Sequence, residues 1–133
     1  MPEHQHILIV DDDAKVLFIM RATLEKLGNA YRIATAGDGR EALAKAKNQP
    51  FDLIISDVRM PGIDGIRLVE MIRALNTETA IILITAYGCE NLKAECERLS
   101  VSGCLEKPLR INEIRRAVLT VLEIDSGQKK MIE

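Results

Sequence analysis

Five short runs of apolar residues recur along the chain, and each is followed by a segment with helical spacing. The runs are His6–Val10, Tyr31–Thr35, Asp52–Ser56, Ala80–Ile84 and Gly103–Leu105. Three of them are nearly continuous Ile, Leu and Val, which is typical of strands buried on both faces of a parallel sheet. The second and fifth runs are weaker, and we expect them nearer the edges of the sheet.

Between these runs, apolar residues recur at spacings of three and four, as on one face of a helix. The pattern predicts helices over Ala14–Leu27, Arg40–Lys47, Ile66–Leu75, Glu90–Leu99 and Asn112–Ile124. Alternation of strand and helix indicates parallel strands joined by right-handed crossovers. A closed barrel needs about eight such units, and this chain has room for five. We therefore expect a flavodoxin-like, doubly wound (βα)5 α/β fold with a five-stranded parallel sheet in the order 2-1-3-4-5.

Length and composition fit one globular domain. The chain has 133 residues, of which 47% are hydrophobic and 29% charged, and the last residues are polar. We expect one domain over residues 1–124 and a polar C-terminal tail, or the start of a linker, over 125–133. The net charge of −2 provides no global basic field for nucleic acid or an acidic membrane. No apolar run approaches the roughly 20 residues of a membrane helix, so we expect a cytoplasmic protein with no membrane partner.

The three cysteines do not form a recognisable pattern. Cys89, Cys96 and Cys104 are odd in number and widely spaced, unlike a disulfide framework or a zinc site. We expect them to be small apolar filler or tolerated thiols.

Polar residues gather at the carboxyl ends of the predicted strands. These residues are Asp11, Asp12 and Asp13, Ser56 and Asp57, Thr85, and Glu106, Lys107 and Pro108. Ligands of doubly wound sheets bind at this edge, close to the point where the strand order reverses. Strands 1, 3 and 4 are neighbours in the expected order, so most of these side chains should share one small concave site.

The chemistry of this edge indicates a cation and a phosphoryl group. Crowded carboxylates such as Asp11, Asp12 and Asp57 repel one another unless protons or a cation lie among them, and Mg²⁺ prefers such oxygen ligands. Lys107 and the hydroxyl of Thr85 add a cation and a donor suited to phosphate. A carboxylate in such a site can act as the nucleophile and form an aspartyl phosphate. Asp13 is instead expected to cap the first helix.

Four segments together resemble the response-regulator receiver domains of two-component signalling systems. They are ILIVDD with Asp11 and Asp12, DLIISDVRMPGIDG around Asp57, ITAYG around Thr85, and EKP around Lys107. The resemblance covers about residues 6–124, and it is specific because all four segments agree in identity, order and spacing.

The resemblance implies a role for each site residue. Asp57 would be the phosphoacceptor and a ligand of Mg²⁺. Asp12 would bind the ion directly, Asp11 directly or through water, and Arg59 through its backbone carbonyl. Thr85 would donate a hydrogen bond to a phosphoryl oxygen.

The segment around the lysine carries further expectations and one departure. Lys107 would pair with the phosphoryl charge, and the Lys107–Pro108 bond would be cis, a form essentially confined to X-Pro bonds. Three residues before this lysine, many receivers have an aromatic residue that turns inward when the threonine moves. Cys104 occupies that position here, so the usual threonine–aromatic switch is in question. Arg59 and Tyr87 flank the site and would modulate the lifetime of the phosphoryl group.

The family resemblance also implies partners. A histidine kinase, a phosphotransfer protein or a small donor such as acetyl phosphate would supply the phosphoryl group, and the domain would catalyse only its own phosphorylation and dephosphorylation. An output domain or a homodimer would use the face formed by helix 4 (Glu90–Leu99), strand 5 (Gly103–Leu105) and helix 5 (Asn112–Ile124). The segments DVRMPGIDG and TAYG resemble receivers that precede σ54-dependent transcription activators, without direct nucleic acid binding by this domain.

Three other functions compete with this interpretation. A phosphatase of the haloacid-dehalogenase type would also place aspartates after strand 1, but Lys15 stands where such enzymes usually have Thr or Val. A phosphate-independent interaction module would keep the fold without the chemistry, although Asp12, Asp57, Thr85 and Lys107 are all present. A zinc or redox role for the cysteines is the weakest alternative.

Overall fold

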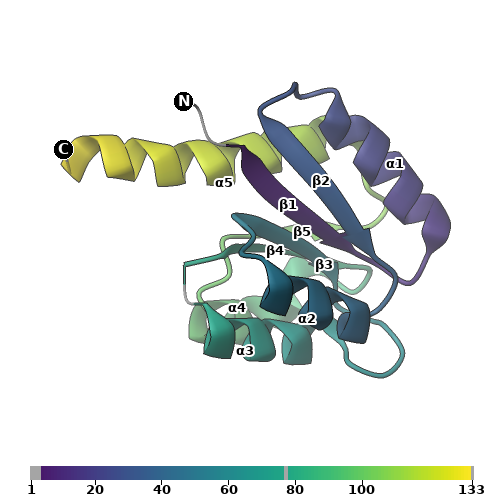
Figure 1. The fold of residues 1–133 in the computed structure, drawn as a ribbon. Coiled ribbons are helices and arrows are strands. Elements are labelled where there is room, and N and C mark those ends of the chain that lie inside the picture. Colours follow the sequence, from purple (N-terminus) through teal and green to yellow (C-terminus); the bar gives the residue numbers. More distant parts are fainter. Residues whose placement is uncertain (1–3, 77, 133) are drawn as a thin grey trace.

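Five parallel strands form one sheet with helices on both of its faces (Figure 1). The computed structural model describes the backbone of residues 4–76 and 78–132 and the side chains of these ranges up to Glu123. The strands are β1 (Gln5–Val10), β2 (Tyr31–Ala36), β3 (Leu53–Asp57), β4 (Ala80–Thr85) and β5 (Gly103–Glu106). Their order is β2-β1-β3-β4-β5, which confirms the predicted fold class and places the two weaker runs at the edges.

The helices follow the predicted alternation with two differences. They are α1 (Ala14–Glu25), α2 (Gly39–Asn48), α3 (Gly65–Leu75), the 3-10 helix η1 (Cys89–Leu92), α4 (Lys93–Arg98) and α5 (Ile111–Ile132). Within the described ranges, none of them combines the length and the apolar character of a membrane span.

The single helix predicted over Glu90–Leu99 is wrong in detail, because η1 and α4 divide the segment. Neither η1 nor α4 contains a buried residue, so no continuous apolar face holds the segment in one regular helix.

The predicted helix end at Ile124 is also too early, since α5 continues to Ile132. No proline follows Ile124, and the single Gly127 weakens a helix without ending it. The domain boundary at residue 124 stays a prediction.

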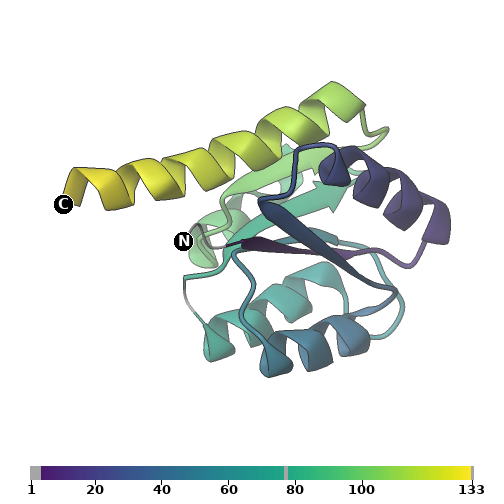
Figure 2. The same ribbon diagram turned by 45° about the horizontal axis from the view of Figure 1, so that its top comes forward.

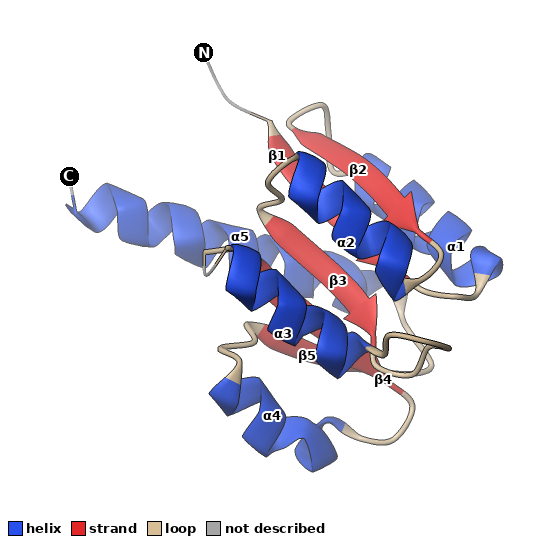
Figure 3. Cartoon of the chain, turned by 60° about the horizontal axis from the view of Figure 1, so that its bottom comes forward, coloured by secondary structure: helices blue, strands red, loops and turns tan. Residues whose placement is uncertain are grey.

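Helices cover both faces of the sheet (Figures 2 and 3), and a layer of apolar side chains lies under them on each face. Along β1, Ile7 and Ile9 pack with α1 and α5, whereas Leu8 and Val10 pack with α2 and α3. This division follows from the pleat, which sends successive side chains to opposite faces. Both layers bury apolar residues, which explains why the central strands are continuously hydrophobic rather than alternating.

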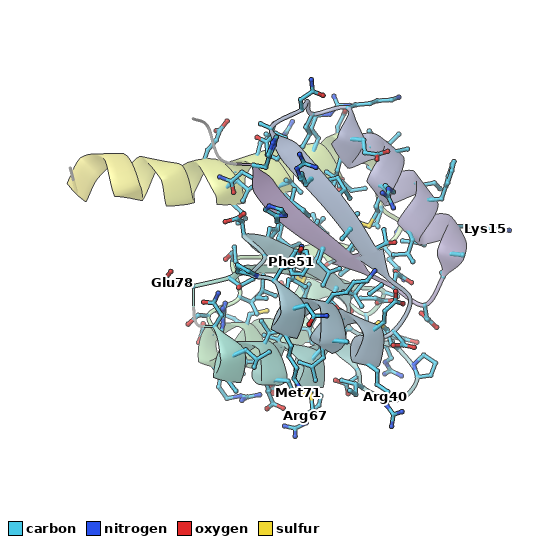
Figure 4. The ribbon with its side chains drawn as sticks, in the orientation of Figure 1. Lys15, Arg40, Phe51, Arg67, Met71 and Glu78 are labelled. Carbon is cyan, nitrogen blue, oxygen red and sulfur yellow. A yellow bond between two sulfur atoms is a disulfide. The ribbon has the colours of Figure 1, made fainter. Side chains whose placement is uncertain are left out.

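Charged side chains lie on the outer surfaces of the helices. Figure 4 shows Lys15, Arg40 and Arg67 pointing away from the body of the domain, and all three are exposed. The helices that carry them begin at aspartates that accept a backbone N–H: Asp13 from Lys15 at 2.9 Å for α1, and Asp64 from Arg67 at 2.8 Å for α3. The predicted capping role of Asp13 is confirmed.

The chain returns to the end of β3 through a tight approach at Gly65. This residue begins α3, and its N–H donates to the carbonyl of Val58 at 2.8 Å. A Cβ at this position would lie 2.3 Å from the carbonyl oxygen of Asp57 and 2.8 Å from the Cα of Val58. These neighbours are backbone atoms, which cannot move aside as a flexible side chain does. Gly65 therefore fixes how closely α3 approaches the end of β3.

Replacing Gly65 by alanine should destabilise the protein by about 2 kcal/mol, because overpacking against fixed atoms displaces the backbone. Urea unfolding followed by circular dichroism would measure the loss. Gly37→Ala is the matched control, since its Cβ would meet only Glu41 Oε1 at 3.7 Å, an ordinary contact. Equal stability of the Gly65→Ala variant and the parent would contradict the proposed close approach.

Candidate functional site

Three carboxylates meet at the carboxyl edge of the sheet. Asp11 and Asp12 follow β1, and Asp57 ends the neighbouring strand β3. One ligand oxygen from each lies within 4.8 Å of the others. Asp11 is 1% exposed and Asp57 5% exposed, whereas Asp12 lies at the surface. The predicted clustering of these three residues follows from the parallel pairing of β1 with β3, in which Val10 lies opposite Ser56.

Lys107 brings a positive charge to the same point. Its Nζ donates to Asp57 Oδ2 at 2.9 Å and lies 3.8 Å from Asp11 Oδ2. Its backbone N–H donates to the carbonyl of Thr85 at 2.8 Å, which fixes where the side chain begins. Burial lowers the pKa of Lys107, but the hydrogen bond to Asp57 and the charges of Asp11, Asp57 and Asp12 outweigh it, so that the pKa is raised. The lysine is therefore cationic at neutral pH.

Asp11 lies in an unfavourable environment for a negative charge. Its Oδ1 accepts the backbone N–H of Asp13 at 2.8 Å, but its buried Oδ2 has no hydrogen-bond partner among the described residues. Burial raises the pKa of Asp11, the hydrogen bond from Asp13 lowers it, and the charge of Asp57 raises it again, with a net increase. A buried carboxylate oxygen without a donor, beside two further carboxylates, is what a hard divalent cation satisfies. The site residues thus fit a cation such as Mg²⁺.

A hydroxyl and a bulky pair complete the edge. Thr85 ends β4 and is 2% exposed, and its Oγ1 accepts the backbone N–H of Tyr87 at 3.0 Å. Arg59 is two residues after Asp57, and its backbone N–H donates to Asp57 Oδ1 with an N–O distance of 3.4 Å. The guanidinium carbon of Arg59 lies 4.5 Å from the centre of the Tyr87 ring, in a cation–π contact. Two loops that approach the site from β3 and β4 therefore touch each other through these side chains.

The cysteines differ from the expectation. Cys89 and Cys104 form a disulfide with a Cα–Cα distance of 5.9 Å, whereas Cys96 is a free, half-buried thiol. The expectation of three unpaired filler residues is therefore wrong for two of them. Spacing in the sequence gave no signal, because the contact depends on the packing of η1, which follows β4, against β5. Cys104, at the position where many receivers have an aromatic residue, is bonded to the first residue of η1, which follows β4.

The remaining site residues lie at the same edge. The Lys107–Pro108 peptide bond is cis. Sequence reasoning missed Cys89 as the partner of Cys104. It placed Glu106 at this edge but gave it no partner, whereas its carboxylate accepts the backbone N–H of Cys89 at 2.9 Å. This contact depends on the register that places Glu106 opposite Thr85.

A doubly wound sheet whose carboxyl edge combines three carboxylates, a lysine and a buried threonine is the arrangement that the resemblance to receiver domains implies. The family model of the response regulator receiver domain matches residues 7–119, and the chain belongs to this family. The phosphatase alternative has no support from this match.

Relatives and solved structures agree with this assignment. The chain is 37% identical over 109 residues to the transcriptional regulatory protein ZraR of Escherichia coli (strain K12), covering 82% of this chain and 24% of that protein. It is 31% identical over 124 residues to sporulation initiation phosphotransferase F of Bacillus subtilis (strain 168), covering 93% of this chain and 98% of that protein. The structure of the chemotaxis response regulator CheY4 of Vibrio cholerae at low pH has a TM-score of 0.82 and 34% identity, over 89% of this chain and 98% of that one. The chain thus spans about a quarter of the length of ZraR but nearly all of the other two.

Replacing Asp11 by asparagine should stabilise the metal-free protein by about 1 kcal/mol, because it removes a buried charge whose Oδ2 has no hydrogen bond and whose repulsion by Asp57 and Asp12, together with burial, outweighs the attraction of Lys107. In excess Mg²⁺ the gain should disappear, since the parent then gains free energy from ion binding that the variant largely loses. Urea unfolding in EDTA and in Mg²⁺ would measure both differences. Asp13→Asn, outside the cluster, is the control and should not respond to Mg²⁺ differently from the parent. A loss of stability of the Asp11→Asn variant in EDTA would count against the account of the cluster given above.

Proposed function

We propose that this domain is a phosphorylation-dependent signalling switch that accepts a phosphoryl group on Asp57 in a Mg²⁺-dependent reaction. The donor is a histidine kinase or a phosphotransfer protein, with small donors such as acetyl phosphate acting in its place. The observation that carries the proposal is the placement of Asp57: one oxygen lies 2.9 Å from Lys107 Nζ, and the carboxylate shares a cluster with Asp11 and Asp12. A nearly buried carboxylate between a cation site and a lysine is suited to act as a nucleophile.

The reaction needs little covalent chemistry from the protein. A carboxylate oxygen of Asp57 attacks the phosphorus, the O–P bond forms as the P–N bond of phosphohistidine breaks, and the imidazole leaves with its electron pair and takes up a proton. The bound Mg²⁺ would neutralise charge on the transferred phosphoryl oxygens, as in other phosphoryl transfers. Asp11, Asp12, Asp57 and the backbone carbonyl of Arg59 are the ligands we assign to it.

Two groups would hold the phosphoryl oxygens after transfer. Lys107 exchanges its bond with Asp57 for the stronger charge of the phosphoryl group. Thr85 would donate a hydrogen bond from its hydroxyl to a second oxygen. Because Thr85 Oγ1 now accepts the N–H of Tyr87 at 3.0 Å, a shift of this hydroxyl also moves the loop that follows β4. The phosphorylated site is in this way connected to η1 and α4.

The surface formed by α4, β5 and α5 is the output of the switch. β5 is the last strand of the sheet, so its outer edge presents unpaired backbone groups. A cavity of about 360 Å³ lies there between β5 and α5, lined in part by Cys104, Leu105, Glu113 and Arg116. A partner, an output domain or a second copy of this chain would bind this surface. We place the protein in the cytoplasm and connect it with control of transcription, in the manner of receivers that precede σ54-dependent activators.

The domain is a substrate that assists its own modification rather than an enzyme acting on others. The similarity to a sporulation initiation phosphotransferase concerns nearly its whole length and agrees with a place in a phosphorelay. Asp57 would then pass or lose its phosphoryl group without a separate substrate site.

Incubation with acetyl phosphate and Mg²⁺ should add one phosphoryl group to the parent, and intact-mass spectrometry measures it directly. Asp57→Asn should remove the adduct completely, and omission of Mg²⁺ should reduce the rate by at least about 100-fold, since the ion neutralises developing charge. Asp13→Asn is the control and should be phosphorylated at the parental rate. An adduct that survives in the Asp57→Asn variant would refute the assignment of the acceptor, and a folded parent that binds neither phosphoryl group nor beryllofluoride would favour a phosphate-independent module.

The contact of Arg59 with Tyr87 supports a second, kinetic proposal. The two side chains meet 4.5 Å apart, measured from guanidinium carbon to ring centre, and they come from the segments that follow Asp57 and Thr85. We propose that this pair slows hydrolysis by restricting the attacking water.

Arg59→Ala and Tyr87→Ala should each speed dephosphorylation by about threefold to tenfold, and the double variant should be no faster than the quicker single one. Non-additivity is expected because each single change already removes the contact of Arg59 with Tyr87 that restricts the attacking water. Phosphate release at pH 7 after removal of the donor measures the rates, and Tyr87→Phe, which keeps the ring, serves as the control. Rates of both single variants equal to the parental rate would remove the proposal.

A further inference from the structure

The disulfide joins the two segments that hold the hydroxyl and the ammonium group of the site. Cys89 follows Thr85 by four residues, and Cys104 precedes Lys107 by three. Beside the disulfide, the N–H of Cys89 donates to the Glu106 carboxylate at 2.9 Å. Glu106 belongs to β5 and pairs with Thr85 of β4. The short loop after Thr85 is therefore held to β5 at Thr85 by strand pairing and at Cys89 by the disulfide.

From Cys89 to Arg98 the segment closed by the disulfide contains no buried residue, and only Leu99, after α4, anchors it in the core. The bridged residues are separated by 15 positions in the sequence, and η1 and α4 lie between them. Neither of these helices contains a buried residue. Segments with few buried apolar contacts open at low free energy, so a covalent link has a large influence on where this one lies.

We propose that Cys89 and Cys104 are a redox-sensitive pair whose disulfide form holds the loop after Thr85 against β5 and prevents phosphorylation from rearranging the α4–β5 surface. The inference rests on the proposed phosphorylation of Asp57. In the dithiol form the loop follows Thr85 toward the phosphoryl group, and the surface responds. The disulfide leaves Asp57, Asp11 and Asp12 untouched, so the oxidised protein accepts a phosphoryl group but does not transmit it.

The redox step is a thiol–disulfide exchange with a small-molecule disulfide such as oxidised glutathione. The thiolate of one cysteine attacks a glutathione sulfur, a mixed disulfide forms and one glutathione thiol leaves. The second cysteine, as its thiolate, then displaces the other glutathione. The pair thereby gives up two electrons and two protons, and one oxidised glutathione becomes two reduced ones.

The cysteines are open to such a reagent. A cavity of about 490 Å³ is lined by Cys89, Cys96 and Cys104, together with Lys93 and residues of α4. Its place beside η1, outside the carboxylate site, lets a reagent reach the sulfur atoms without entering the phosphoryl site. A disulfide in the reducing compartment proposed above is expected to be a transient, redox-sensing bond rather than a permanent staple.

Cys96 lines the same cavity but is the less reactive thiol. Burial, followed by the charge of Glu95, raises the pKa of Cys96, which keeps it protonated and a poor nucleophile. It is therefore a matched control: a third cysteine in the same place that should not be needed.

The first experiment measures the bond itself, without phosphorylation. The full chain is equilibrated in glutathione buffers of graded redox poise, free thiols are alkylated, and mass spectrometry counts them and maps the linked peptides. We expect one two-electron transition linking Cys89 to Cys104, retained in Cys96→Ser and lost in Cys89→Ser. Transitions that link Cys96 instead, or only mixed glutathione adducts, would overturn the proposal.

The second experiment measures the coupling. Oxidised and reduced parent are phosphorylated with acetyl phosphate and Mg²⁺, and amide hydrogen exchange is followed over residues 86–99. We expect phosphorylation to change exchange rates there by about tenfold in the reduced protein and by less than about twofold in the oxidised one. Cys89→Ser under oxidising conditions should behave as the reduced parent.

Equal responses of the two redox forms would contradict the coupling. Intact mass on the same samples reports phosphoryl uptake separately. Uptake without a redox-dependent response therefore overturns only this inference, whereas absence of uptake in both forms overturns the proposed phosphoacceptor together with the coupling.

Discussion

The rest of this domain depends on the repulsion among three carboxylates whose oxygens lie within 4.8 Å of one another. Asp11 and Asp57 are almost fully buried, and Lys107 neutralises only part of the charge of the cluster. Such an arrangement opposes folding, so it persists only because the surrounding sheet determines where each residue lies. The free energy comes from the apolar layers on both faces of the central strands, which extend to Val10, directly before Asp11, and to Ile55, two residues before Asp57. The strands β1 and β3 therefore supply both the apolar residues that stabilise the fold and, at their ends, the carboxylates of the site.

Much of this could be predicted from sequence because the relevant signals are local. Runs such as ILIV and LIIS mark buried parallel strands, and their alternation with helices restricts the topology to a few possibilities. Once the order of strands is fixed, Asp11, Asp12 and Asp57 must lie at one edge, whatever their side-chain conformations. Lys107 follows in the same way, since its N–H pairs with the end of β4.

The features that escaped prediction depend on contacts between distant segments. Nothing near Cys89 indicates Cys104, because their proximity depends on the packing of η1 against β5. The division of η1 from α4 reflects the lack of a buried face, which a count of helix-favouring residues does not register. The contact of Arg59 with Tyr87 joins two loops whose paths depend on close approaches such as that of Gly65. Side-chain partners of this kind are set by tertiary structure, and sequence pattern is silent about them.

The length of α5 has a mechanical consequence. The helix is anchored to the sheet through Ile114, Val118, Val121 and Leu122, but its backbone continues to Ile132 beyond the body of the domain (Figure 1). At about 1.5 Å per residue, the projecting part is roughly 15 Å long. A tilt of the anchored part of α5 against the sheet would also displace this projecting part. For a tilt of about 10°, the far end would move by roughly 2.5 Å, so a small rearrangement at the sheet would give a larger displacement at the tip.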